Sequence, residues 1–186
     1  MADGTHRLAD ARARARRTAR PAGALVGARP GTRVRRLLVI DLDDAQGRGP
    51  ALATEELARL RAAVDAGRFA LAIATSADRG AVEAALTAAA EGGTVPPFAL
   101  IALDADEGSR ARTAPAHLAT ICRRERATFA STAVVATRRE DLPLLLEAGC
   151  ALALADAGTA CRAAADRCLP SHAEGGLIAA LGLLER

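Results

Sequence analysis

The chain lacks four residue types altogether: its 186 residues include no Lys, Asn, Trp or Tyr, and only three Phe. All 25 basic residues are therefore Arg, as a GC-rich coding sequence would produce. With so little aromatic area, the core must be built from Ala, Leu, Val and Ile. A chain of this length that is 51% hydrophobic is long enough for one domain with a single core.

Several classes of protein are excluded by motifs that the sequence lacks. No apolar run reaches the ~18 residues of a membrane span and no secretory signal is present, so we expect a cytoplasmic protein without a membrane partner. No P-loop, G-x-G-x-x-G or Ser-His-Asp order occurs, which argues against NTPases, dinucleotide enzymes and serine hydrolases. The four cysteines have no C-x-x-C spacing, which indicates reduced thiols.

The net charge of +3 is unevenly distributed along the chain. Residues 1–36 carry ten Arg against Asp3 and Asp10, whereas the remainder carries more acids than Arg. Residues 1–34 show no apolar periodicity, so we expect an Arg-rich, disordered leader followed by one domain over 35–186. Attraction of the leader to nucleic acid or a membrane surface is the alternative, and nucleic acid is not the expected partner.

After the leader, strand-like and helix-like segments alternate. Short apolar runs of the buried-strand type lie at 37–40, 69–74, 98–103, 132–136 and 151–154. Helical patterns lie at 54–67, 77–93, 115–126, 140–149, 159–168 and 174–186, with Thr54 as an N-cap and Pro115 in a first turn. The alternation predicts an α/β fold: a doubly wound, mostly parallel, five-stranded Rossmann-like sheet with helices on both faces.

Acidic and hydroxyl side chains follow the predicted strands. Because right-handed crossovers bring the carboxyl ends of parallel strands to one edge, these residues should gather there. They are Asp41, Asp43, Asp44, Thr75, Ser76, Asp104, Thr137, Glu140, Asp141 and Asp156. A divalent cation would neutralise such a cluster, and oxygen ligands favour Mg²⁺.

Three stretches resemble motifs of the haloacid-dehalogenase (HAD) superfamily. "LLVIDLDDA" resembles the first motif, D-x-D at a strand tip, and "FALAIATSADRG" is similar to the second, a strand ending in Thr or Ser. The section from Thr132 to Leu181 is similar to the closing part of the sugar-phosphate phosphatase branch, which includes sucrose-phosphate phosphatase. The resemblance spans roughly residues 35–184, and the closing section is its most specific part.

The resemblance implies a site and a reaction. Asp41 would attack phosphorus and form an aspartyl phosphate, while Asp43 would protonate the leaving oxygen and then activate water. Thr75 would donate to a phosphoryl oxygen. Mg²⁺ would bind Asp41, the backbone carbonyl of Asp43 and the fourth-motif acid Asp141, with a small phosphorylated, sugar-like compound as substrate.

The chain also departs from the family pattern. Ala45 replaces the usual Thr or Val of the first motif, and no Lys is available as the third-motif cation, for which Arg110 or Arg112 could substitute. In the fourth motif Thr137 replaces a metal-binding Asp and Glu140 replaces an amide. The cap domain of that branch is missing, so an open site is expected.

Three hypotheses follow. The first is a weak Mg²⁺-dependent phosphatase. The second is a pseudo-phosphatase that acts as a regulatory or interaction domain, with a protein partner such as a glycosyltransferase. The third is a receiver-like phosphoacceptor domain. Strand order separates the third from the others: the HAD sheet places the first strand between the second and fourth, and a receiver places it between the second and third. Thr75 and Ser76 as simple helix caps, and the acids as a solvated loop start, are the structural alternatives.

Overall fold

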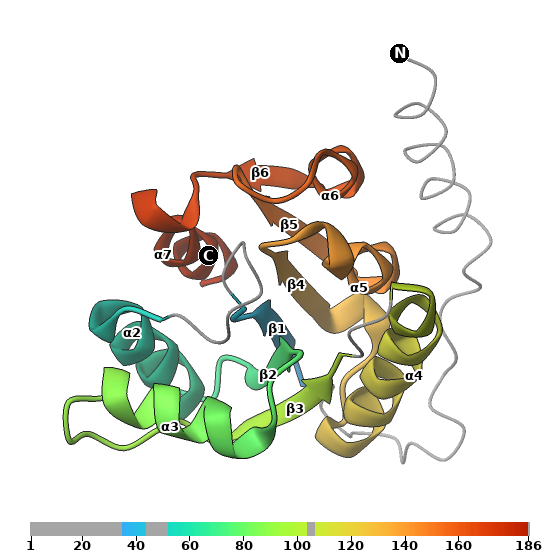
Figure 1. Ribbon diagram of the computed structural model, residues 1–186. Coiled ribbons are helices and arrows are strands. Elements are labelled where there is room, and N and C mark those ends of the chain that lie inside the picture. Colours follow the sequence, from blue (N-terminus) through green and yellow to red (C-terminus); the bar gives the residue numbers. More distant parts are fainter. Residues whose placement is uncertain (1–34, 44–51, 104–106, 186) are drawn as a thin grey trace.

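A computed structural model describes residues 35–43, 52–103 and 107–185 (Figure 1). The side chains of 107–113, including Arg110 and Arg112, are not among the described parts. Of the residues singled out in the sequence, Asp44, Ala45, Asp104 and the leader 1–34 lie outside the described residues.

Six parallel strands form one sheet in the order β3-β2-β1-β4-β5-β6. Short apolar runs favour strands that are buried on both faces, as the burial of β1, β2 and β4 shows. The strands are β1 (Leu37–Asp41), β2 (Ala70–Thr75), β3 (Phe98–Ala102), β4 (Thr132–Ala136), β5 (Cys150–Leu154) and β6 (Arg167–Leu169).

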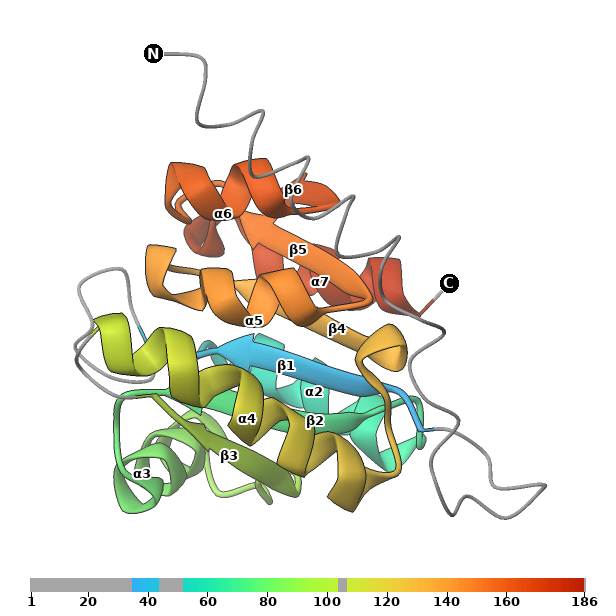
Figure 2. The same ribbon diagram turned by 90° about the vertical axis from the view of Figure 1, so that its right-hand side faces the viewer.

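Helices cover both faces of the sheet, as a doubly wound fold requires (Figure 2). One face carries α2 (Thr54–Asp65), α3 (Arg79–Ala89) and α7 (Gly176–Leu184). The other carries α4 (Glu107–Glu125), α5 (Leu142–Glu147) and α6 (Thr159–Ala164). Short 3₁₀ turns, η1 (Phe129–Ser131), η2 (Arg139–Asp141) and η3 (His172–Glu174), connect them. The predicted α/β class is confirmed.

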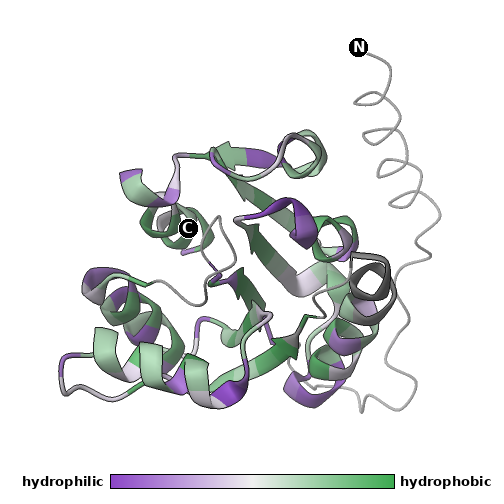
Figure 3. Cartoon of the chain, viewed as in Figure 1, coloured by the Kyte–Doolittle hydropathy of each residue, from purple (hydrophilic) through white to green (hydrophobic). Residues whose placement is uncertain are grey.

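The core is divided by the sheet into two aliphatic layers. Alternate residues of β1 point to opposite faces, so Leu38 and Ile40 pack with α2, α3 and α7, while Leu37 and Val39 pack with α4, α5 and α6. Figure 3 shows apolar strands inside and hydrophilic residues on the outer surfaces of the helices. Apolar burial on both faces fixes the strands, and thereby the positions of their ends.

Some predicted elements differ in detail. The sheet has a sixth strand, β6, which was assigned to the end of a helix; three largely exposed residues give no apolar signal. Helix α4 begins at Glu107, and Pro115 therefore lies inside it instead of in its first turn. The N-cap of α2 is Ala53, one residue before Thr54, and the Glu56 side chain accepts from its N–H at 2.9 Å.

The strand order decides one of the three hypotheses. β1 pairs with β2 on one side and β4 on the other, which is the HAD arrangement and excludes the receiver arrangement. The connection from β3 to α4 comprises residues 103–106, so no cap domain is inserted there. Among the described helices, none is long and apolar enough to cross a membrane.

Gly149 provides a test of the packing before β5. A Cβ at this position would lie 2.2 Å from the carbonyl oxygen of Ala130, because Gly149 donates its N–H to Phe129 at 2.8 Å. We expect Gly149→Ala to lower the free energy of unfolding by about 1–3 kcal/mol, measured by urea denaturation. Gly182→Ala, in α7 with nothing within 4 Å of the new Cβ, should instead stabilise the protein by ~1 kcal/mol. Equal losses in both variants would contradict the packing argument.

Candidate functional site

The carboxyl ends of β1 and β4 lie side by side, and this adjacency builds the site. Ile40 pairs with Val135, so Asp41 at the tip of β1 faces the turn 137–141 that follows β4. Asp41, Asp43, Thr75 and Asp141 are all buried at this edge. Four predicted site residues separated by up to 100 positions are thus brought together.

Asp43 is fixed by hydrogen bonds to both carboxylate oxygens. Its Oδ1 accepts from the Thr75 hydroxyl. Its Oδ2 accepts from the Ser76 N–H at 2.9 Å and from the Ser76 hydroxyl at 2.7 Å. Its own N–H donates to Asp41 Oδ1 at 2.8 Å. Thr75 at the end of β2 and Ser76 after it therefore position the Asp43 carboxylate. These contacts are not helix caps.

Arg138 supplies the cation of the site. Its Nε donates to Asp41 Oδ2 at 2.9 Å and its Nη2 donates to Asp43 Oδ2 at 2.8 Å, and its side chain is only 9% exposed. Burial opposes the charged guanidinium, but the charges of Asp41 and Asp43 outweigh burial and raise the pKa of Arg138. The sequence predicts a cation at Arg110 or Arg112 and does not point to Arg138, which directly follows Thr137.

Asp141 shapes the turn from which Arg138 projects. Its Oδ2 accepts from the N–H of Thr137 at 2.9 Å and from the N–H of Arg138 at 3.0 Å. Its Oδ1 is buried and has no hydrogen-bond partner among the described residues. A buried carboxylate oxygen without a donor is costly, and only a protonated Asp41 carboxyl would donate a hydrogen bond to Asp141 here. With Asp41 ionised, this oxygen is the unsatisfied point of the site.

The carboxyl groups of Asp41 and Asp141 lie close enough to affect each other's ionisation. The pKa of Asp41 is raised well above its ordinary value of 3.8 by burial first and by the Asp141 charge second, and Arg138 only partly offsets this. Burial also raises the pKa of Asp141, against hydrogen bonds that favour its charged form. A further positive charge would stabilise the pair.

Two more contacts hold the turn after β4. The Thr137 hydroxyl donates to the backbone carbonyl of Asp43 at 3.4 Å. The Cys161 thiol of α6 donates to the Arg138 carbonyl at 3.1 Å, and burial raises the pKa of this thiol to about 12. Cys161 is thus an inert, protonated group that supports the Arg138 backbone.

The residues at this edge fit Mg²⁺ through two carboxylates. Within the described part of the chain, no group of three or more His, Cys, Asp and Glu forms a metal-binding cluster. Asp41 and Asp141 nevertheless present a buried pair with an unpartnered oxygen, and Mg²⁺ is often bound by one or two carboxylates with water and phosphate as its other ligands. The Asp43 carboxylate is directed to Thr75 and Ser76, so its role in metal binding stays a prediction.

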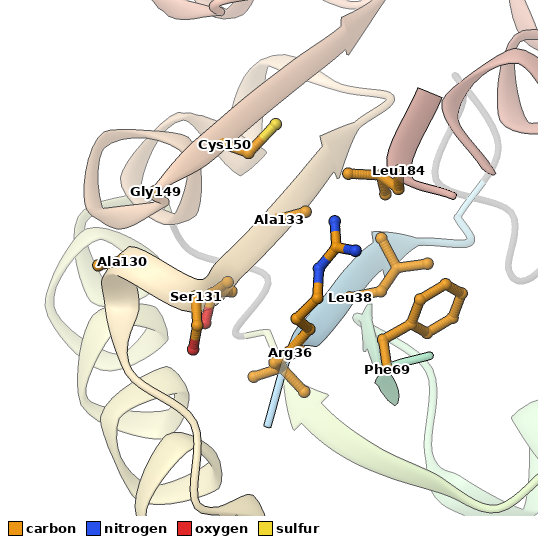
Figure 4. Close-up of a pocket in the computed structure, with 11 residues that line it drawn as sticks. Arg36, Leu38, Phe69, Ala130, Ser131, Ala133, Gly149, Cys150 and Leu184 are labelled. Atoms are coloured by element: carbon orange, nitrogen blue, oxygen red, sulfur yellow. The ribbon is translucent and has the colours of Figure 1, made fainter. Parts of the chain in front are cut away.

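A cavity lies away from these acids. A cavity of about 120 Å³ opens at the amino-terminal ends of β1 and β4, where Arg36, Phe69, Ser131 and Cys150 are among its lining residues (Figure 4). None of its lining residues is acidic. It contains no pair of groups suited to acid–base or nucleophilic chemistry, so the candidate site remains the opposite edge.

The carboxyl end of β5 carries a separate ion pair. His172 Nε2 lies 3.0 Å from Glu56 Oε2, and the backbone N–H of His172 donates to Asp156 Oδ2 at 3.3 Å. The hydrogen bond with Glu56 raises the pKa of His172, while burial opposes it. Burial would raise the pKa of Glu56, but its hydrogen bonds with His172 and Ala53 lower it. The pair joins η3 to the start of α2.

This pair predicts a pH-dependent stability. Because the pKa of His172 is raised in the folded state, its contribution is full below its ordinary value of 6.5 and is lost as the pH rises through the folded pKa. We expect His172→Ala to lower the melting temperature by ~2–4 °C at pH 6 and by much less at pH 9. His117→Ala, on the exposed surface of α4, is the control. A loss independent of pH would refute the ion-pair explanation.

The comparisons with known proteins rest on structure alone, because no family model and no curated protein sequence matches this chain. The cobalt-bound deoxy-D-mannose-octulosonate 8-phosphate phosphatase of Haemophilus influenzae is 17% identical, with a TM-score of 0.59, over 81% of this chain and 87% of that chain. A HAD-superfamily (subfamily III A) hydrolase of Legionella pneumophila is 16% identical, with a TM-score of 0.61, over 81% of each chain.

A third similar structure contains ligands. The 3-deoxy-D-manno-octulosonate 8-phosphate phosphatase of Moraxella catarrhalis, in complex with magnesium, phosphate and KDO, is 15% identical, with a TM-score of 0.60, over 81% of this chain and 85% of that chain. Two of these neighbours are metal-bound octulosonate 8-phosphate phosphatases and the other is a subfamily III A hydrolase. They do not support the sucrose-phosphate-phosphatase branch that the sequence suggested. The chain therefore has the HAD-like α/β fold of these structures, with no cap domain inserted between β3 and α4.

Proposed function

We propose that this chain is a HAD-type phosphohydrolase that acts slowly on small phosphomonoesters through Asp41. The observation that carries the proposal is the position of the Asp41 carboxylate. It stands at the tip of the central strand β1, two residues before Asp43 and close to the unpartnered Oδ1 of Asp141. The phosphatase neighbours with the same fold support this reading.

The reaction would proceed in two displacements at phosphorus. An Asp41 carboxylate oxygen attacks phosphorus, an O–P bond forms and the bond to the leaving oxygen breaks. Asp43, carrying a proton at that stage, gives it to the leaving alkoxide; its carboxylate then takes a proton from the water that cleaves the aspartyl phosphate. The second step restores Asp41 and releases phosphate. Thr75, whose hydroxyl bonds to Asp43, would turn to a phosphoryl oxygen.

Asp41 and Asp141 would bind Mg²⁺, with the backbone carbonyl of Asp43 as a further ligand. When bound, the ion would offset repulsion between the carboxylates and the phosphate. Thr137 now donates its hydroxyl to that carbonyl, so it would release this contact. Asp141 would keep its Oδ2 on the backbone of the turn and use its free Oδ1 for the ion.

A sugar-like phosphate is the substrate class that we propose. No cap domain closes the edge between β3 and α4, so the substrate is held chiefly by its phosphate. The neighbour from Moraxella catarrhalis binds phosphate and KDO, which supports a phosphorylated sugar acid in preference to sucrose phosphate.

A non-catalytic domain that binds a protein partner is the second candidate, and one observation favours it. Arg138 occupies Asp41 Oδ2 and Asp43 Oδ2, and Thr75 is engaged by Asp43. The groups that would react are therefore bonded to one another. In that case the fold would serve regulation or interaction, with a glycosyltransferase as one possible partner class.

Loss of the nucleophile is the first test. We expect Asp41→Asn to reduce turnover of an aryl phosphate with Mg²⁺ by ~10³-fold or more, because the amide cannot form the acyl phosphate. The matched control is Asp78→Asn, which follows β2 and can still cap α3. The measurement is release of the phenol at 1–10 mM Mg²⁺. Equal rates for wild type, Asp41→Asn and the control would reject the proposal and favour the non-catalytic domain.

Asp141 gives a second test that needs no substrate. Asn at this position can still accept from the Thr137 and Arg138 N–H groups but removes a buried charge beside Asp41. We expect Asp141→Asn to raise the melting temperature in EDTA by ~2–4 °C at pH 7.5. It should also abolish the stabilisation that Mg²⁺ gives to wild type. An unchanged Mg²⁺ effect would show that the ion binds elsewhere.

A further inference from the structure

Two sets of buried carboxylates at this edge need positive charge. The Arg138 guanidinium contacts Asp41 and Asp43, whereas Asp141 is contacted by the backbone N–H of Arg138. The guanidinium donates to Asp41 and Asp43 through its Nε and Nη2, and its single charge offsets only part of theirs. Asp141, equally buried, keeps one oxygen without a donor among the described residues. Asp41 belongs to both sets, since Arg138 contacts its Oδ2 and Asp141 raises its pKa.

We propose that Arg138 is a built-in competitor of the divalent cation at Asp41, so that the site binds Mg²⁺ weakly because it already contains a cation of its own. This inference rests on the proposed function for the identity of the ion. It concerns metal affinity, however, and can be tested without turnover.

The competition follows from charge and geometry. A guanidinium 2.9 Å from a carboxylate oxygen cancels much of the potential that would attract a second cation to that carboxylate. A positive charge at such a distance lowers the pKa of a carboxyl group by about 1–3, which is a 10- to 1,000-fold lower affinity for a proton. The affinity of the same carboxylate for a metal ion should be lowered by a similar factor. By linkage, Mg²⁺ must loosen the Arg138 contacts to the same extent.

Hydrogen bonds to its backbone hold Arg138 in the position from which it competes with the ion. Asp141 holds the Arg138 N–H at 3.0 Å, and Cys161 donates to the Arg138 carbonyl at 3.1 Å from the other side. Its side chain is 9% exposed and its charge is stabilised by Asp41 and Asp43. Arg138 thus cannot be neutralised at working pH, and little water is available to replace its partners.

The main experiment is calorimetric titration of Mg²⁺ into the full chain. We expect Arg138→Gln to bind Mg²⁺ ~10- to 100-fold more tightly than wild type. Arg139→Gln is the matched control: it removes the same charge one residue away, on an exposed side chain, and should change the affinity less than ~3-fold. Unchanged or weaker binding by a folded Arg138→Gln would overturn the inference, as would an equal gain in the control.

A second pair of variants covers the case in which Arg138→Gln does not fold. Removing the cation leaves three buried acids, so Asp43→Asn alone is compared with Asp43→Asn plus Arg138→Gln, which keeps the charge of the site balanced. The double variant should bind Mg²⁺ the more tightly of the two by ~10-fold or more. Equal affinity in this pair would overturn the inference.

Failure of this inference and failure of the proposed function give different results. Asp41-dependent turnover with no affinity gain in the Arg138 variants would leave the phosphatase standing and remove the competition. A gain in affinity without any turnover would support the competition and favour the non-catalytic domain.

Discussion

The ion pairs of the Arg138 guanidinium with the buried carboxylates of Asp41 and Asp43 are the interactions on which this site depends. Asp41 and Asp43 end an apolar strand and are almost entirely removed from water, where isolated charges would cost several kcal/mol each. Arg138 compensates both at 2.8–2.9 Å, and Thr75 and Ser76 complete the shell of Asp43. For Asp41 the compensation is partial, because burial and the neighbouring Asp141 still raise its pKa.

The sheet order explains why these partners meet. β1 lies between β2 and β4, so the residues after β2 and those after β4 reach the tip of β1 from opposite sides. Thr75 and Ser76 approach Asp43 from one side, and the turn of Arg138 approaches Asp41 from the other. This geometry is compatible with catalysis by a carboxylate nucleophile and with a purely structural role of the ion pairs. The two roles differ in whether Arg138 releases its contacts with Asp41 and Asp43.

Much of the fold could be predicted from periodicity. Apolar runs separated by helical patterns gave five strands, and motif likeness placed Asp41, Asp43, Thr75 and Asp141 on a common edge, where the structure has them. β6 could not be predicted because three exposed edge residues carry no apolar alternation. The start of α4 was misplaced because proline usually marks a first turn, whereas Pro115 lies inside this helix.

Arg138 was missed for a different reason. Two adjacent arginines follow Thr137, and periodicity in a turn does not show which of them points inward. Only the capping of the turn by Asp141 directs Arg138 to Asp41 and leaves Arg139 exposed. A usable signal existed: Arg138 lies two residues after the end of β4, beside the predicted acids of the same edge, and can therefore reach them.

The turn after β4 also determines how folding and metal loading are related. Thr137 and Arg138 are neighbours, so one tight turn contains both a neutral residue at a ligand position and a guanidinium that satisfies the acids. A carboxylate in place of that hydroxyl would add a fourth, half-buried acid to the edge and would increase its need for positive charge. Here the polypeptide supplies one positive charge of its own, so part of the charge of these acids is offset before any metal ion binds.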